Sequence, residues 1–384
     1  MFILILSLLV GISFFPLLFA DFEKFQLWHA QGIWTQALIM MAFSWSFFEN
    51  PKNLNRKNVP LGLLHLWVGG STVYICTRSQ IVGVYNYWTL FPYFNFLCLI
   101  ILYKLITMYL TKDNVRIILE WLRYVVIATL IVSVLQYLGL SQFFDLLTKE
   151  YTGTNYNIVS GFIGNGTHLS GFLAMCIPLF LWKKTEEDFL AIVLLFLVLC
   201  LSGTSIGEPA ISGFIIAAVL MAYMSKKRWV WATVLIVMGI VAVAMIYNLK
   251  PILLRSNGRM GLWEPYLPLI RNNFILGHGL GTVKLLSTKP EFPNAHHLHL
   301  EYYQYLVELG FVGLILIGNL ILEFFKKKTQ TSMDKVLKAI VYGFLLSCLF
   351  NFPSHLWLPS VFAIFAYSAF LIKEKNHDIF TQGT

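Results

Sequence analysis

The chain has 384 residues, of which 58% are hydrophobic and only 12% are charged, whereas about 25% of the residues in a soluble domain are charged. This composition excludes an ordinary soluble domain and predicts a protein embedded in a lipid bilayer. The net charge of +9 would suggest nucleic-acid binding in a soluble protein, but here the distribution of Lys and Arg along the chain matters more, and we expect no nucleic-acid partner.

A membrane-spanning helix needs about 20 mostly apolar residues, and this rule predicts an all-α, polytopic integral membrane protein of about twelve transmembrane helices. The predicted spans cover roughly residues 2–20, 31–48, 61–77, 88–110, 117–139, 159–182, 189–206, 209–224, 229–248, 310–325, 336–352 and 358–373. Residues 1–20 lack a basic n-region and an A-x-A cleavage site, so we expect a retained first helix rather than a cleaved signal peptide.

Orientation follows from the basic residues, because cytoplasmic loops carry an excess of Lys and Arg. With both termini in the cytoplasm, the inner loops hold basic clusters such as 226–228 and 326–328, whereas the short outer loops hold only Lys24, Arg78 and Lys149. The chain then divides into residues 1–248 with helices 1 to 9, an outer segment at 249–309, and residues 310–384 with helices 10 to 12 and a cytoplasmic tail.

The outer segment, residues 249–309, is the longest piece of the chain outside the predicted spans. It holds four of the nine histidines and the cations Lys250, Arg255, Arg259, Arg271, Lys284 and Lys289. Long translocated loops are partly exempt from the positive-inside bias, so these cations are either merely tolerated or bind an anion delivered at the outer membrane surface. Within this segment we expect a helix that starts after Pro293, with Asn294 as its cap.

From Ala295 to Gly310 the pattern is helical, and the next span begins at Gly310. On such a helix His299, Tyr302 and Tyr303 are neighbours at spacings of three and four residues. One face of the helix would therefore present an imidazole surrounded by aromatic rings.

Two patterns in residues 255–313 belong together. His299-Leu300 is followed by nine residues and then by Gly310-Phe-Val-Gly313, and upstream lie Arg259, Trp263 and the run Gly277-His-Gly-Leu-Gly281. This arrangement resembles the bacterial O-antigen ligase and O-antigen polymerase superfamily of multi-spanning membrane glycan transferases, whose members share His-Asn, nine residues and Gly-x-x-Gly. Leu300 departs from that pattern, because the family has Asn there. The arginine that many members carry at the outer end of an earlier helix is also missing from the comparable residues 201–209. Arg255 or Arg271 would then take its role.

The resemblance implies a metal-independent glycosyltransferase of lipopolysaccharide biosynthesis in the bacterial inner membrane. An O-antigen ligase moves a glycan from an undecaprenyl-pyrophosphate carrier to a lipid A core sugar hydroxyl at the periplasmic face. The alternative within the superfamily is a polymerase, whose acceptor is another carrier-linked repeat unit. An alternative of another class is a membrane transporter, which ionisable groups at mid-depth or inverted repeats would favour; the sequence shows little of either.

The reaction needs a fixed cation for the pyrophosphate leaving group and a base for the sugar hydroxyl. We assign the cation to Arg259, because a guanidinium stays charged and offers a planar fork to phosphate oxygens; the alternative is a loop arginine paired with Glu264. We assign the base to His299, which stands at the family position; the alternative is a hydrogen-bonded packing residue. The residues predicted to bind the substrate are Arg255, Arg271, His297, Tyr303, Trp263, His278 and Asn165.

Two further patterns leave alternatives open. Asn165 lies in the polar stretch 161–168 at the outer end of the sixth span, which either lines the cleft for the carrier lipid or packs through small residues. A zinc site from His296, His299 and a carboxylate has no clean third ligand, and the five cysteines lie in apolar runs without paired spacing. We therefore predict no metal and no cofactor, and expect His299 and Arg259 to converge on one pocket above the outer leaflet.

Overall fold

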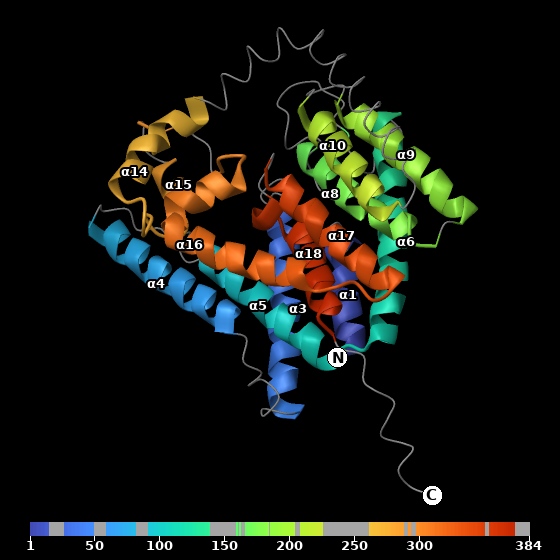
Figure 1. Ribbon diagram of the computed structural model, residues 1–384, viewed down its shortest axis with the longest axis horizontal. Coiled ribbons are helices and arrows are strands. Elements are labelled where there is room, and N and C mark those ends of the chain that lie inside the picture. The colour runs from blue at the N-terminus through green and yellow to red at the C-terminus, as the bar shows by residue number, and fades with distance from the viewer. Residues whose placement is uncertain are drawn as a thin grey trace, which may run out of the picture.

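The computed structural model describes residues 1–14, 27–49, 59–81, 91–138, 159, 161–162, 166–183, 185–203, 208–225, 261–287, 291–292, 297–349 and 353–372. Within these ranges every regular element is a helix, which confirms the all-α prediction (Figure 1). The longer helices are α1 (Phe2–Phe14), α3 (Leu27–Glu49), α4 (Val59–Ile81), α5 (Phe91–Tyr109), α6 (Lys112–Tyr137), α8 (Gly166–Phe180), α9 (Glu186–Gly203), α10 (Glu208–Met224), α16 (Glu301–Lys326), α17 (Ser332–Ser347) and α18 (Trp357–Phe370). Short helical pieces are η3 (Glu264–Tyr266), α14 (Leu267–Asn272), α15 (Thr282–Leu286) and η4 (Pro353–His355).

Membrane-like helices are present in the described ranges. Three are long and apolar enough to cross a membrane, namely Pro92–Tyr109, Lys112–Tyr137 and Glu301–Lys326, and they overlap predicted spans at 88–110, 117–139 and 310–325. Shorter apolar helices include Phe2–Gly11, Leu61–Ile75, His168–Phe180, Ser212–Met224 and Trp357–Phe370. The predicted span at 229–248 lies outside the described residues.

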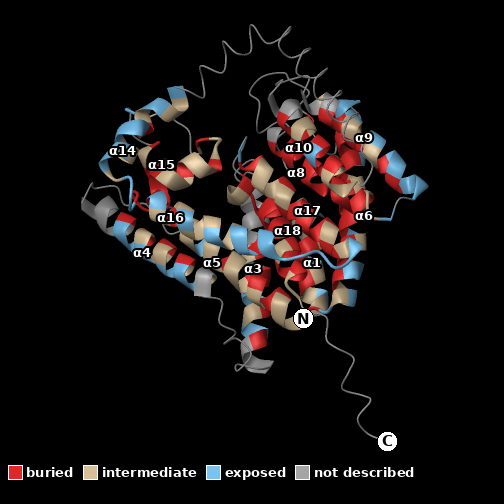
Figure 2. Cartoon of the chain, viewed as in Figure 1, coloured by how far each residue is buried: buried red, intermediate tan, exposed pale blue. Residues whose placement is uncertain are grey.

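Helix α8 lies at the centre of the largest core. Its residues from 168 to 180 are all buried, and α10, α17 and α9 pack around it (Figure 2). Glycines permit this close packing, since a Cβ on Gly343 of α17 would lie 2.8 Å from the Met175 backbone of α8. Small residues let helix backbones approach one another where no hydrophobic effect drives association in lipid.

Two ion pairs join separate helices of the core. Arg123 of α6 is 8% exposed and donates to Asp188 at the start of α9, which is 1% exposed. Lys112, at the start of α6, lies 2.8 Å from a carboxylate oxygen of Asp334 at the start of α17. Each pair joins segments far apart in the sequence, so each contributes to how the helices are arranged.

The prediction of a helix from Ala295 is wrong over residues 297–300. Helix α16 begins at Glu301, and His299 before it has a positive φ of 53°, a left-handed conformation that cannot continue a helix. The predicted cap, Asn294, lies outside the described residues. The segment turns instead because its polar groups find partners elsewhere: the Glu301 amide donates to the Cys348 carbonyl at 3.1 Å. His299 therefore does not share a helical face with the tyrosines of α16.

Helix α16 is broken at Gly310, where the sequence predicted that a new span begins. Gly310 has φ 66° and ψ −171°, and helical residues continue on both sides of it. The first part, 301–309, lies beside α14 and α15, and the second part runs on to Lys326 (Figure 1). The break divides the more polar stretch 301–309 of α16 from its apolar stretch 311–326.

Candidate functional site

The two glycine motifs of the sequence, 277–281 and 310–313, meet at the break in α16. A break leaves backbone amides and carbonyls without helical partners, and here the 274–279 segment supplies them. Four backbone hydrogen bonds join the segments: His278 N to Val307 O at 3.0 Å, Gly279 N to Glu308 O at 2.7 Å, Phe311 N to Phe274 O at 2.9 Å and Val312 N to Ile275 O at 3.2 Å. The motifs therefore form one structural unit.

Glycine is required at these positions for two reasons. Gly277, Gly279 and Gly281 have φ values of 71°, 101° and 88°, a region that only glycine enters readily. A Cβ on Gly277 would also lie 2.6 Å from the Glu308 carbonyl oxygen, and one on Gly279 would lie 2.7 Å from the Ser71 carbonyl oxygen of α4. These glycines therefore permit a tight turn that lies between α4 and α16.

Glu308 connects the break to α15. One of its carboxylate oxygens accepts the Val283 amide at 3.2 Å and the Gln304 side-chain amide at 3.3 Å, and the residue is only 1% exposed. A carboxylate at the first turn of a helix is favoured by the exposed amides there. By fixing the start of α15, Glu308 sets the position of Lys284, the residue that follows Val283.

Lys284 lies near a group of histidines from three parts of the chain, and we call His168, His297, His299, His355 and Lys284 the histidine cluster. The rings of His297 and His355 are 4.4 Å apart between centroids. Burial, followed by the charges of His355, Lys284, His299 and His168, holds the pKa of His297 well below its ordinary value. Burial also lowers the pKa of Lys284. An anion that entered the cluster would relieve this repulsion.

His355 is held by a polar network on its other side. Its Nδ1 lies 3.2 Å from each carboxylate oxygen of Glu301, and the same carboxylate accepts the Ser354 amide at 2.8 Å and the Ser354 hydroxyl at 2.6 Å. Its Nε2 lies 3.2 Å from Nε2 of Gln304. Burial by itself lowers the pKa of His355, but the charge and hydrogen bond of Glu301, together with Glu308, raise it above its ordinary value.

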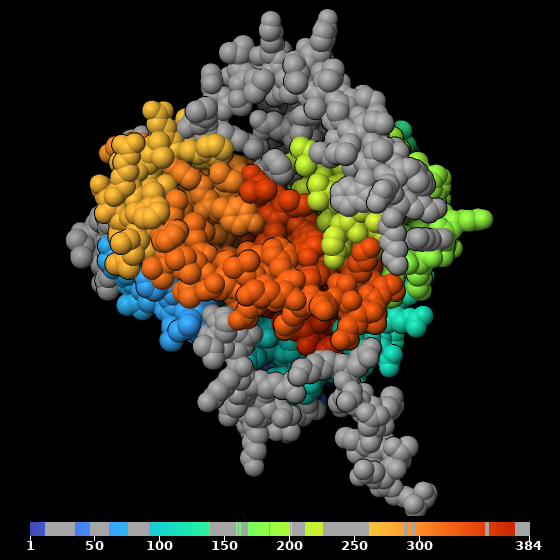
Figure 3. All heavy atoms as spheres, viewed as in Figure 1, coloured from blue at the N-terminus to red at the C-terminus, as the bar shows by residue number. Residues whose placement is uncertain are grey.

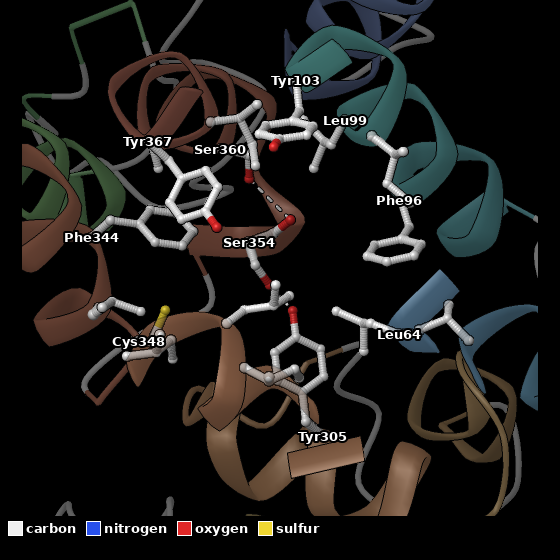
Figure 4. Close-up of a pocket in the computed structure, with 18 of the residues that line it drawn as sticks. Leu64, Phe96, Leu99, Tyr103, Tyr305, Phe344, Cys348, Ser354, Ser360 and Tyr367 are labelled. Atoms are coloured by element: carbon white, nitrogen blue, oxygen red, sulfur yellow. Dashed lines mark hydrogen bonds between the residues drawn. The ribbon is translucent and has the colours of Figure 1, made fainter. Parts of the chain in front are cut away.

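An apolar cavity of about 300 Å³ lies beside this network, between α4, α5, α16, α17 and α18. Most of its lining is aliphatic or aromatic, as Leu64, Phe96 and Phe344 illustrate in Figure 4. Ser354, with His355, lines one part of it. The cavity therefore combines an apolar body with a polar edge that belongs to the histidine cluster, a combination typical of ligand sites.

Segments far apart in the sequence form this region. Figure 3 shows the orange part of the chain near residue 300 in contact with the red C-terminal part on one face of the molecule. The bonds between Glu301 and Ser354 make the same connection at the level of single atoms. The loop between the last two predicted spans thus lies against the outer segment.

Trp263 and Tyr303, both predicted to bind substrate, hold the turn at 297–300. Nε1 of Trp263 donates to the Leu298 carbonyl at 2.7 Å, and the Tyr303 hydroxyl donates to the Trp263 carbonyl at 2.9 Å. Their rings are 6.0 Å apart between centroids. The structure therefore brings Trp263, Tyr303, His297 and His299 into one region.

The remaining predicted residues are placed differently. Nε2 of the buried His278 lies 2.8 Å from the Leu269 carbonyl, a contact that fastens α14 to the glycine turn. Arg271 is exposed in the last turn of α14. Arg255, Arg259 and Asn165 lie outside the described residues. The convergence of Arg259 with His299 therefore stays a prediction.

Sequence reasoning missed Gln304, Ser354 and His355 in the second half of the site. It pointed to Glu301 only as a partner for His297, whereas the structure pairs Glu301 with His355. A signal was present, because Pro353-Ser354-His355 falls between the predicted spans 336–352 and 358–373, and the predicted topology puts that loop on the same side as the 249–309 segment. Among the described residues no group of three or more His, Cys, Asp or Glu side chains is arranged to hold a metal ion.

Comparisons with models of known protein families and with the sequences of curated proteins find no match to this chain.

Proposed function

We propose that this chain is a membrane glycan transferase of the O-antigen ligase type. In this proposal it moves a glycan from undecaprenyl-pyrophosphate to a lipid A core sugar hydroxyl at the periplasmic face of a bacterial inner membrane. The observation that carries the proposal is the position of His355, which lines the apolar cavity and also lies against His297 in the histidine cluster. An apolar cavity and a group of basic side chains thus lie on either side of His355.

Such a site suits a substrate with an apolar chain and an anionic head. Burial of a prenyl chain against aliphatic and aromatic side chains contributes roughly 25 cal/mol per Å² of apolar surface. Lys284 and the imidazoles then face the pyrophosphate, whose negative charge grows as the glycosidic bond breaks. Because burial lowers the pKa values of Lys284 and His297, a bound anion would favour their charged forms.

The chemical step needs a proton transfer from the acceptor hydroxyl and the departure of the pyrophosphate carrier. In the proposed reaction His299 takes the proton from the acceptor hydroxyl, whose oxygen forms the new bond to the sugar. The old bond to the carrier breaks, and its electron pair stays on the pyrophosphate oxygen, where Arg259 stabilises it. Arg259 is proposed on the sequence resemblance alone, whereas His299 also has its place beside His297 in its favour.

The proposed topology has about twelve spans with both termini in the cytoplasm. It is supported by the way α16 and α17 pack. The start of α16 is bonded to the end of α17 through the Glu301 amide and the Cys348 carbonyl, while the basic residues 326–328 lie in the turn at the other end of both helices. The site and this basic turn therefore lie at opposite ends of α16 and α17. Because basic loops favour the cytoplasmic side, this arrangement favours a periplasmic site in the proposed topology.

The test is transfer of a labelled glycan by purified protein in lipid vesicles, from an undecaprenyl-pyrophosphate donor to a lipid A core acceptor. His299→Ala should lower the rate by about 10²- to 10⁴-fold, the usual contribution of a general base, and Arg259→Ala should lower it comparably. His65→Gln is the matched control, because this histidine stacks on Tyr93 and Phe96 and is not a member of the histidine cluster.

Three outcomes would count against the proposal in different ways. Transfer only to a second carrier-linked glycan would make the protein a polymerase. Movement of donor across the vesicle membrane without transfer would make it a transporter. Full activity in both variants would remove His299 and Arg259 from the mechanism.

A further inference from the structure

The side-chain amide of Gln304 has only one orientation that satisfies its neighbours. The backbone amide of Leu298 lies 3.2 Å from Oε1 of Gln304 and must donate, so this atom is the oxygen. Nε2 then donates to Glu308 at 3.3 Å and faces Nε2 of His355 at 3.2 Å. Gln304 is 2% exposed, so a reversed amide would lose its partners with little access to water.

This orientation determines where His355 carries its proton. Because Gln304 donates to Nε2 of His355, that nitrogen must be an acceptor, and the proton of the neutral ring is on Nδ1. Nδ1 points at Glu301, which is fully buried and is held by the amide and hydroxyl of Ser354. Hydrogen bonds therefore run in one direction, from Leu298 to Gln304, from Gln304 to His355, and from His355 to Glu301.

We infer that Glu301, His355 and Gln304 form an ordered hydrogen-bond chain that positions the turn bearing His299 for glycan transfer. This inference rests on the proposed function. His299 follows Leu298 directly and has a positive φ of 53°, a conformation that costs an L-residue free energy. The turn persists because Leu298 is held at both its amide and its carbonyl, by Gln304 and by Trp263. In this scheme the three residues of the chain are positioning residues, and His299 remains the base.

The chain also makes the turn sensitive to pH. Protonation of His355 at Nε2 would set a donor against the Gln304 amide and break the link to Leu298. The charged or titratable groups around His355 are Glu301, Glu308 and Tyr305 of α16, His297 of the turn, and Lys284 of α15. Burial lowers the pKa of His355, but Glu301 and Glu308 raise it above its ordinary value. Transfer should therefore begin to fall at a higher pH than an ordinary histidine would give, in addition to the acidic fall caused by protonation of the base His299.

The first test measures hydrogen exchange at residues 297–300 in the full-length protein in lipid. Gln304→Leu removes the acceptor for the Leu298 amide, so exchange there should become about fivefold faster, as expected for the loss of one hydrogen bond. Tyr302→Phe is the matched control, since it removes a bond from the same helix to the Leu345 carbonyl instead. Unchanged exchange in Gln304→Leu would overturn the inference.

The second test measures transfer. His355→Phe should lower kcat at least tenfold with little change in KM for the donor. His355→Gln, whose side-chain oxygen can replace Nε2 as acceptor, should recover most of kcat and keep only the acidic fall that protonation of the base His299 causes. Equal losses in both variants, or faster exchange with unchanged kcat, would overturn the positioning role. A wild-type protein that transfers no glycan would instead refute the proposed function, while the exchange result would still decide whether the chain holds the turn.

Discussion

Replacement of Gly310 by alanine tests whether the break in α16 is built as described. A Cβ at this position would lie 2.5 Å from the carbonyl carbon of Leu276 and closer still to the Gly277 amide nitrogen and the Ile275 carbonyl oxygen. All three atoms are backbone, so no side-chain rotation relieves the clash. Either the segment at 274–279 moves away, or α16 straightens and leaves it.

The cost follows from two contributions. A residue other than glycine at φ 66° and ψ −171° costs about 1–3 kcal/mol. Displacement of the glycine turn breaks at least two of its four backbone bonds to α16, which contribute about 1 kcal/mol each. We therefore expect Gly310→Ala to lower the free energy of unfolding by about 3–5 kcal/mol.

The measurement is thermal or denaturant unfolding of the purified protein in a mild detergent, with transfer activity measured alongside. Gly318→Ala is the matched control, because it lies on the same helix with no atom within 4 Å of the added Cβ. It should unfold at or slightly above the wild-type midpoint, since alanine favours helix. If Gly310→Ala and Gly318→Ala unfold alike, the glycine turn is not docked on a broken helix.

Three further predictions concern other parts of the fold. Asp188→Asn removes the more buried of the two carboxylates paired with Arg123, the other being Glu120, and should cost about 1.5–3 kcal/mol in an unfolding experiment. Glu187→Gln, exposed on the same helix, should change stability by less than about 0.5 kcal/mol; equal effects would contradict the buried pair. Burial raises the pKa of Asp334, but its lysine partner outweighs burial and the pKa is lowered overall. The charged form therefore stabilises the fold above the unfolded pKa of about 3.9, and this contribution is lost as the pH falls through the lower, folded value. Unfolding curves between pH 6 and pH 3 measure this loss of stability, which Asp334→Asn should not show. Ala363→Phe narrows the apolar cavity and should raise KM at least tenfold for a donor with a long prenyl chain and little for one with a short chain; equal changes for both donors would show that the cavity does not hold the chain.

Much of the fold was predictable because a bilayer imposes a simple rule on sequence. Spans need long apolar stretches, so the all-helical character and the position of helices such as α5 and α6 follow from hydropathy. The boundary of α16 was not predictable in this way. Residues 295–300 have a helical pattern, but the Leu298 and Glu301 amides are taken by Gln304 and by the Cys348 carbonyl, and tertiary bonds override local preference.

The candidate site was also predictable only in part. The glycine motifs, His297 and His299 stand close together in sequence and can be recognised by spacing. His355 and Ser354 follow His299 by more than fifty residues, and nothing in their own neighbourhood names Glu301 as a partner. That pairing exists only because the end of α17 and η4 are hydrogen-bonded to the start of α16.

By itself, the amino-acid order determined the apolar helices, the polar outer segment and the glycines at which the backbone turns, since each depends on a few neighbouring residues. The tertiary structure decided which polar groups face one another: that Glu308 caps α15, that Gln304 holds Leu298, and that His355 links a cavity to the histidines. These contacts join distant segments, and the free energy of burying a polar group is recovered only once its partner has been brought beside it.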